Sequence, residues 1–237
     1  QNPNSNLTAK TEAKISYLTK DGFIKNHWWK TVILIVFSIA IYFQTSGYGY
    51  VLDDAIVIED NNYTKKGFGG IWEIMTTESM QGYFGEQKNL VQGNRYRPLS
   101  LVSFAIEYGI FGDKNPGFSH FINILLYALS CILLMRCFQL MIYKENKLNN
   151  WLDIGFITAV LFCVHPLHVE AVANIKGRDE IMAFLFSMGT LYFMVKHFMY
   201  GASKNVFYVG LLSYFLGLLS KENTITFLGV IPISFYF

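Results

Sequence analysis

The sequence predicts an all-α polytopic membrane protein, and two observations support this prediction. Of the 237 residues, 52% are hydrophobic and only 15% are charged, whereas a soluble domain carries about 25% charged residues. Long apolar runs also recur along the chain, and a membrane-spanning helix needs about 20 such residues. The net charge of +2 is small and no basic cluster is present, so we expect no nucleic-acid partner.

Six apolar runs are predicted to be transmembrane spans. The first covers residues 31–52 without a charge, and the second covers 115–135, interrupted only by His120. The other four are shorter and reach spanning length when their ends lie in the membrane interface. These four are 154–169, 181–195, 205–220 and 223–237.

The predicted organisation has four parts. A cytoplasmic N-terminal tail (1–27) precedes a first transmembrane helix (28–46) and a long extracytoplasmic loop (47–117). About five further transmembrane helices occupy 118–237. Because the last apolar run has no polar tail, we expect the chain to continue with later spans.

Lysines set the predicted orientation. Residues 1–27 contain four lysines beside the first span, and lysine-rich flanks stay on the cytoplasmic side. The spans then alternate, so the charged stretches that begin at Asp53, His165 and Lys221 all open on the extracytoplasmic side. The loops expected inside are 143–151 and 199–205, and those expected outside are 47–117, 165–180 and 219–223.

The three cysteines lie inside apolar runs and form no CxxC pair. We therefore expect them to be buried hydrophobic side chains rather than disulfides or metal ligands. They are Cys131, Cys137 and Cys163.

The long outer loop begins with a pair of carboxylates, Asp53 and Asp54. Adjacent residues point in different directions, so we expect one carboxylate to act on a ligand while the other anchors the loop. Physical grounds do not separate the two, and Asp54 is our first choice for the acting group. The plainer interpretation is a solvated turn or a cap.

Two amphipathic interfacial helices are expected later in this loop. Residues 69–78 form one, with Trp72 at the lipid headgroups. Pro98 suits the first position of the other, in which the apolar side chains Leu99, Val102 and Ile106 share a face. Arg97 precedes this helix, where a guanidinium and backbone N–H groups suit a phosphate or serve as a headgroup anchor.

A polar stretch follows the third span. His165, His168 and Glu170 are conceivable metal ligands, but the HExxH spacing is absent and Pro166 interrupts the helical face. We therefore predict no metal site and give these three residues a supporting role. A buried, hydrogen-bonded histidine is the common structural alternative.

Cations follow in the same stretch and again before the last span. Lys176 and Arg178 flank a glycine that allows a turn, and we expect them to bind a phosphate while Asp179 holds Arg178. Lys221 and Glu222 interrupt an apolar run, and charges at membrane depth tend to mark sites. A capped helix start or a surface turn would explain the same residues without a ligand.

Four segments in a fixed order resemble one protein family. They are LDD (52–54), YRPLS (96–100), HPLHVEAVANIKGRDEI (165–181) and LLSKENTIT (218–226). The combination resembles the transmembrane and tetratricopeptide-repeat protein O-mannosyltransferase family, of the membrane-embedded GT-C glycosyltransferase class. The similarity runs from about residue 45 onward, and its HPxHxEAVA element is the most distinctive part.

The resemblance implies a fold, a reaction and a set of partners. It implies a GT-C-like transmembrane helix bundle, and transfer of a sugar, typically mannose, from a polyprenyl-phosphate carrier to Ser or Thr hydroxyls of proteins. The Asp53–Asp54 pair matches the family's catalytic acidic position. It also implies a C-terminal repeat domain that would hold the acceptor protein and lies beyond residue 237.

The chemistry of this transfer then assigns roles. A carboxylate accepts the hydroxyl proton, and cations stabilise the departing lipid phosphate, for which the candidates are Arg97, Arg178, Lys221 and Lys176. Direct displacement inverts the anomeric centre. No diphosphate demands a metal, and the resemblance leaves divalent-metal dependence open.

Other interpretations give the same segments different functions. They are a GT-C transferase with a non-protein acceptor, a non-catalytic scaffold subunit of a membrane complex, and a transporter. The last is disfavoured because the charges gather at span ends rather than at the bilayer midplane. We favour a bacterial inner membrane as the location, and an endoplasmic reticulum membrane would follow the same orientation logic.

Overall fold

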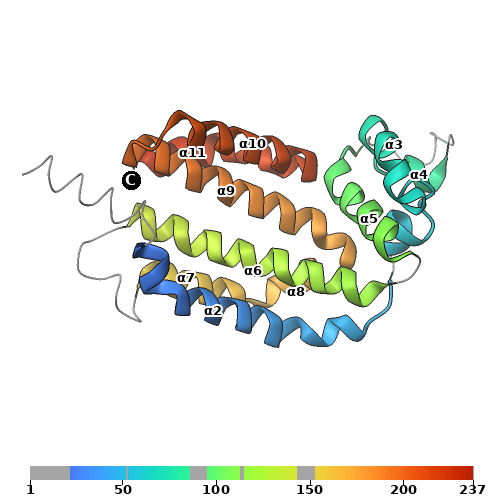
Figure 1. Ribbon diagram of the computed structural model, residues 1–237, viewed down its shortest axis with the longest axis horizontal. Coiled ribbons are helices and arrows are strands. Elements are labelled where there is room, and N and C mark those ends of the chain that lie inside the picture. The colour runs from blue at the N-terminus through green and yellow to red at the C-terminus, as the bar shows by residue number, and fades with distance from the viewer. Residues whose placement is uncertain (1–21, 52, 86–94, 113–114, 143–152, 237) are drawn as a thin grey trace, which may run out of the picture.

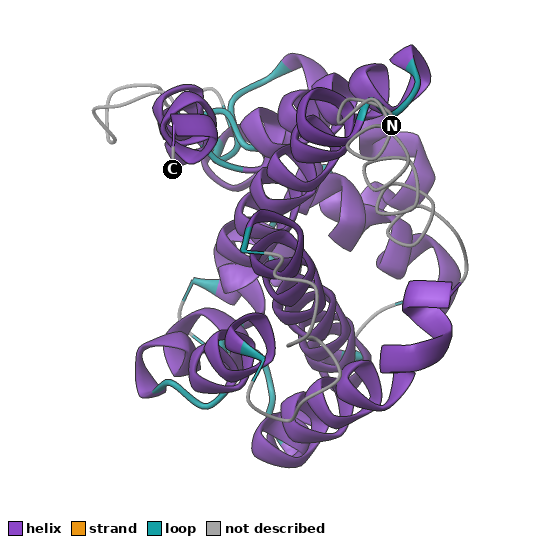
Figure 2. Cartoon of the chain, turned by 90° about the vertical axis from the view of Figure 1, so that its left-hand side faces the viewer, coloured by secondary structure: helices purple, strands orange, loops and turns teal. Residues whose placement is uncertain are grey.

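The computed structural model describes residues 22–51, 53–85, 95–112, 115–142 and 153–236. Within these ranges the chain forms only helices and connecting loops, as Figure 2 shows, so the all-α prediction is confirmed there. Most of the predicted cytoplasmic tail and the loop 143–151 lie outside the described residues.

Six helices lie side by side and run along the long axis of the molecule (Figure 1). The helix α6 contacts α2, α7 and α9, while α10 packs on α9. The six are α2 (Gly22–Tyr42), α6 (Pro116–Met141), α7 (Ile154–Cys163), α9 (Arg178–Tyr200), α10 (Lys204–Ser220) and α11 (Phe227–Tyr236).

Three segments are long and apolar enough to cross a membrane: Trp28–Gly47, Pro116–Met141 and Ile175–Tyr200. The 26 residues of α6 correspond to about 39 Å of helix, which exceeds a hydrocarbon core of about 30 Å. The described residues are thus those of an all-α membrane protein. The count of six spans stays a prediction, because α10 has 17 residues and α11 has 10.

The third predicted span is not one continuous helix. The helix α7 ends at Cys163, and the following pair of short helices, Pro166–Ala173, is bent from it by 53°. Pro166 explains the break because proline disfavours a helical conformation in the residue before it. The chain continues through η4 (Pro166–His168), α8 (Val169–Ala173) and η5 (Ile175–Gly177) to the start of α9.

The long loop after α2 folds into a small helical unit at one end of the bundle (Figure 1). We call this end of the bundle the polar end. Its own apolar cluster includes Ile58, Ile74, Leu101 and Phe104, and Ile175 from the bundle joins it. The elements of this unit are η2 (Ala55–Glu59), η3 (Thr64–Gly70), α3 (Ile71–Thr76), α4 (Gln81–Phe84) and α5 (Pro98–Phe111).

Two features of this unit match the sequence and one does not. The short amphipathic helix α3 exposes 76% of Trp72 and buries Ile74, and α5 begins at Pro98 as predicted. The sequence did not predict which face of α5 packs against the protein: Leu101, Phe104 and Ala105 are buried, whereas Ile106 is exposed. The helix α5 packs against η3, and this contact rather than the helix's own apolar pattern decides which face is buried.

The described cysteines agree with their predicted role, because all three are free and buried.

At the end of the bundle opposite the polar end, a buried ion pair joins α2 to the start of α7. Lys30 Nζ lies 3.0 Å from Asp153 Oδ2, and their side chains are 0% and 4% exposed. Asp153 also accepts a hydrogen bond from the backbone N–H of Gly155 at 2.9 Å, which caps α7.

We predict that Asp153→Ala lowers the free energy of unfolding by about 3–5 kcal/mol, because it leaves the Lys30 ammonium buried without its carboxylate. Glu73→Ala is the matched control: it breaks a pair with Lys66 whose side chains are 35% and 51% exposed, and exposed pairs contribute about 0–1 kcal/mol. Denaturation of the detergent-solubilised protein measures both. Equal losses in the two variants would contradict the structural role of Asp153.

Candidate active site

Asp54 joins the outer loop to the start of α9. Its carboxylate is fully buried, and it accepts hydrogen bonds from the backbone N–H of Val51 at 3.0 Å and of Lys176 at 2.8 Å. Burial raises the pKa of Asp54 above its ordinary value, while the two amide hydrogen bonds oppose the rise. No acceptor molecule reaches a fully buried carboxylate, so Asp54 has the geometry of an anchor.

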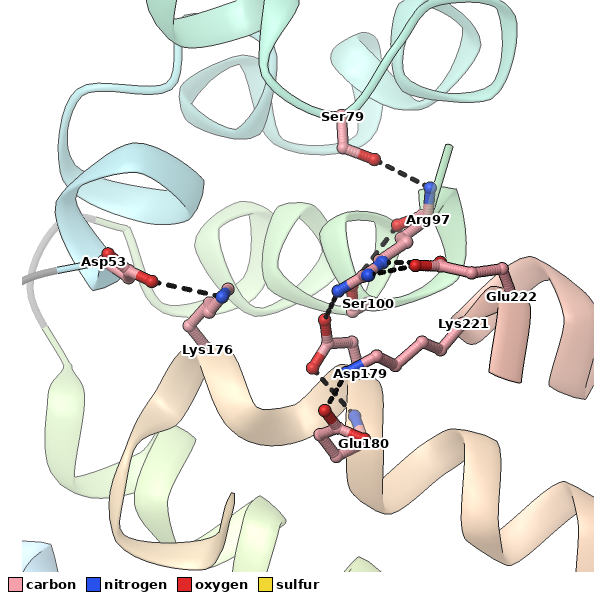
Figure 3. Close-up of polar contacts among 9 residues, drawn as sticks. All are labelled: Asp53, Ser79, Arg97, Ser100, Lys176, Asp179, Glu180, Lys221 and Glu222. Atoms are coloured by element: carbon pink, nitrogen blue, oxygen red, sulfur yellow. Dashed lines mark hydrogen bonds and ion pairs between the residues drawn. The ribbon is translucent and has the colours of Figure 1, made fainter. Parts of the chain in front are cut away.

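Asp53 has the opposite environment. Its side chain is 53% exposed, and its Oδ2 atom lies 3.1 Å from Lys176 Nζ (Figure 3). Lys176 therefore holds both carboxylates, one through its side chain and the other through its backbone N–H. The two carboxylates thus have different environments, one buried and one accessible. The accessible one is Asp53, whereas Asp54 is the acting group preferred from the sequence alone.

Arg97 lies at the centre of an ion-pair network from three segments (Figure 3). Its Nε and Nη2 atoms donate to the two carboxylate oxygens of Glu222 at 2.9 and 2.5 Å, and its Nη1 atom donates to Asp179 at 2.8 Å. Hydrogen bonding to Arg97 lowers the pKa of Glu222 to about 2. The guanidinium is thus held in a fixed orientation at the start of α5, with only 12% of its side chain exposed.

Lys221 lies next to this network and forms an ion pair with Glu180. Burial lowers the pKa of Lys221, whose side chain is only 12% exposed. Asp179 and Glu180 occupy the first turn of α9, where the helix dipole favours negative charge. Two cations and three carboxylates therefore converge from α5, α9 and the turn after α10.

Arg178 does not belong to this surface, which corrects the expectation that it binds phosphate. It is fully buried, and it donates to Asn123, Ser103 and the backbone carbonyl of Ser119 at 2.8–3.0 Å. Its ion-pair partner is Glu107 rather than Asp179. Burial in low dielectric demands such a partner, so Arg178 fastens α5 and α6 to the start of α9.

A cavity of about 470 Å3 begins at these charged groups and continues among apolar side chains. Four carboxylates and two lysines line its polar part: Asp53, Glu170, Asp179, Glu180, Lys176 and Lys221. Its apolar part is lined by side chains from α6, α7 and α9, including Tyr127, Phe162, Ile181 and Phe184. The lining therefore suits a ligand with a polar head and an apolar tail.

The histidine stretch flanks the same cavity. His168 and Glu170 line it, and the His168 ring lies 4.0 Å from the Phe162 ring between centroids. His165 instead caps η4, with its Nδ1 atom accepting from the backbone N–H of Leu167 at 3.3 Å. In the described part of the chain no three His, Cys, Asp or Glu side chains are arranged to hold a metal ion.

Sequence reasoning missed several residues that build this end of the molecule. Glu107 neutralises Arg178, and Asn123 joins α6 to the 174–178 turn through its side-chain amide. Both are polar residues inside otherwise apolar helices, a pattern that indicates a buried partner. Ser79 accepts from the backbone N–H of Arg97 at 2.7 Å and carried no such signal.

Comparison with known proteins finds similar sequences among named protein O-mannosyl-transferases. The chain is 28% identical over 94% of its length to protein O-mannosyl-transferase TMTC4 of Homo sapiens, and 32% identical over 76% to TMTC1 of the same species. It is 30% identical over 70% of its length to protein O-mannosyl-transferase F38B6.6 of Caenorhabditis elegans. The chain spans only 31%, 20% and 23% of these relatives, respectively.

The other two comparisons give no parallel. No protein-family model matches the chain, and no solved structure matches it.

We predict that Asp54→Asn destabilises the fold more than Asp53→Asn. Both carboxylate oxygens of Asp54 accept a backbone N–H. The asparagine side chain replaces one oxygen with an NH2 group, which cannot accept, so one buried backbone N–H loses its acceptor at a cost of about 1–3 kcal/mol. The melting temperature of the purified protein should fall by about 2–4 °C for each kcal/mol lost. Asp53→Asn should change it little because that side chain is exposed. A fall for Asp53→Asn as large as for Asp54→Asn would contradict these assignments.

Proposed function

From the similarity to named protein O-mannosyl-transferases and the geometry of the polar end, we propose that the chain is the membrane-embedded part of a TMTC-type, GT-C-class protein O-mannosyl-transferase. It moves a mannosyl group from a polyprenyl-phosphate carrier to Ser or Thr hydroxyls of proteins on the extracytoplasmic side. The observation that carries this proposal is the cavity that joins an exposed carboxylate, Asp53, to an apolar interior.

The donor occupies this cavity with its lipid tail toward the aromatic side chains. Phe162 and Phe184 stack at 4.9 Å between ring centroids, and with Tyr127 they offer an apolar wall to the first isoprene units. The phosphate then lies at the polar part, near Lys221 and Lys176. Both cations line the cavity, and cations placed where negative charge develops stabilise the departing phosphate.

Asp53 is the general base of the proposed reaction. The acceptor oxygen forms a bond to the anomeric carbon while its proton passes to the Asp53 carboxylate, and the bond between the anomeric carbon and the phosphate oxygen breaks. The products are the O-mannosyl protein and polyprenyl phosphate, with inversion at the anomeric carbon. Lys176 Nζ lies 3.1 Å from Asp53 Oδ2 and holds the carboxylate in place for the proton transfer.

Arg97 orients the site in this proposal. Its guanidinium is engaged by Glu222 and Asp179, so it fixes the start of α9 and the turn after α10 around the donor phosphate. Membrane lipids, the lipid-linked sugar and the acceptor protein are the proposed partners.

The reaction is tested with the protein in liposomes, polyprenyl-phosphate mannose and a Ser/Thr peptide, with mass spectrometry of the product. We predict that Asp53→Asn lowers kcat by about 10²–10⁴-fold, the usual contribution of a general base, because the amide accepts no proton. Asp60→Asn is the matched control, since Asp60 is an exposed carboxylate of the same loop that lines neither this cavity nor the one described next. Unchanged kcat in Asp53→Asn would reject the base assignment, and no transfer by the unmodified protein would reject the proposed function.

A further inference from the structure

A second cavity, of about 190 Å3, adjoins the first at the polar end. Asp53, Lys176 and Asp179 line both cavities, so these three side chains form the boundary between them. The remaining lining residues belong to the second cavity alone. They are Ile56, Val57, Ser79, Met80, Arg95, Arg97, Ser100, Leu101 and Phe104.

The two cavities are built from different parts of the chain. Apart from the shared residues, every described residue that lines the second cavity lies between positions 56 and 104, in the outer loop. The first is lined mainly by α6, α9 and the segment that joins α7 to α9. A ligand that arrives from the aqueous side therefore meets the second cavity, and a ligand held in the bilayer meets the first.

The wall of the second cavity is held in place by hydrogen bonds. The backbone N–H of Ser79 donates to the carbonyl of Arg95 at 2.9 Å, and the backbone N–H of Arg97 donates to Ser79 Oγ at 2.7 Å. Ser100 is 6% exposed and donates to the carbonyl of Arg97 at 3.3 Å. These hydrogen bonds connect the segment at Ser79 to the segment 95–100, and together the two segments form one wall of the cavity.

The size and lining of the second cavity select its ligand. The second cavity, of about 190 Å3, is smaller than the first, of about 470 Å3, and so suits a small side chain with its backbone better than a polyprenyl tail. Apolar residues such as Val57 and Leu101 line part of it, and Arg95, which also lines it, carries donors that suit peptide carbonyls. The lining thus suits a hydroxyl-bearing residue of a polypeptide.

We infer that the second cavity is the acceptor subsite, where a Ser or Thr side chain of an extended polypeptide places its hydroxyl on Asp53. This inference rests on the proposed function. Inverting displacement requires the acceptor oxygen to attack from the side opposite the departing phosphate. Two cavities that share Asp53 on their boundary provide this arrangement, with the donor on the bundle side and the acceptor on the loop side.

The test separates acceptor binding from donor binding in the liposome transfer assay. Met80→Trp and Ile56→Trp fill the second cavity without lining the first. Each should raise the KM for the peptide by at least about tenfold, equal to about 1.4 kcal/mol, with the KM for the donor unchanged. Phe184→Trp in the first cavity should show the reverse pattern. Ile110→Trp, at a 60% exposed position of α5 outside both cavities, should change neither constant.

A smaller substitution keeps the test decisive if the tryptophan variants do not fold. Val57→Ala enlarges the second cavity and should shift the ratio of kcat/KM for Thr over Ser peptides about tenfold toward Thr, the low end for one methylene in a pocket. Active protein whose peptide KM and Thr/Ser ratio do not respond to these variants would overturn the acceptor subsite alone. A lack of all transfer by the unmodified protein would instead reject the function on which it rests.

Discussion

The docking of the outer loop onto the start of α9 is the interaction on which the polar end depends. Asp54 accepts the backbone N–H groups of Val51 and Lys176, one from each segment, inside a fully buried environment. An unpaired buried carboxylate or amide would cost several kcal/mol, so the two segments are held together in one register. That register sets Asp53 against Lys176 and brings the start of α5 to the start of α9.

Charge pairing around this contact lets many ionisable groups collect at the ends of apolar helices. Arg178 is neutralised by Glu107, Arg97 by Asp179 and Glu222, and Lys221 by Glu180. Each pair joins segments distant in sequence, and truncating one partner of a buried pair is strongly destabilising. The network therefore serves both the fold and the site: its buried members hold the helices, and its accessible members line the cavities.

The sequence predicted the parts that depend on local pattern. Uncharged runs became helices, Pro98 began α5, and the segments around Asp53, Arg97, Lys176 and Lys221 converge at one end of the bundle. It did not predict which side chain of each charged pair faces the cavity, because that depends on tertiary docking. Asp54 is buried while Asp53 is exposed, Arg178 is fully buried, and Asp179 pairs with Arg97 rather than with the adjacent Arg178. The buried face of α5 was missed for the same reason, since η3 and not the helix pattern selects it.

The central claim is that a lipid-linked phosphate binds with its tail among α6, α7 and α9 and its head beside Asp53. Photocrosslinking tests it most directly, with the protein in liposomes and a polyprenyl phosphate that carries a photoreactive group on its first isoprene unit. The account predicts that peptide mapping places the label on the cavity wall at Tyr127, Phe162 or Phe184, and that excess unlabelled polyprenyl phosphate prevents labelling. Label confined to outward side chains such as Phe215, which is 57% exposed, and insensitive to competitor would contradict it.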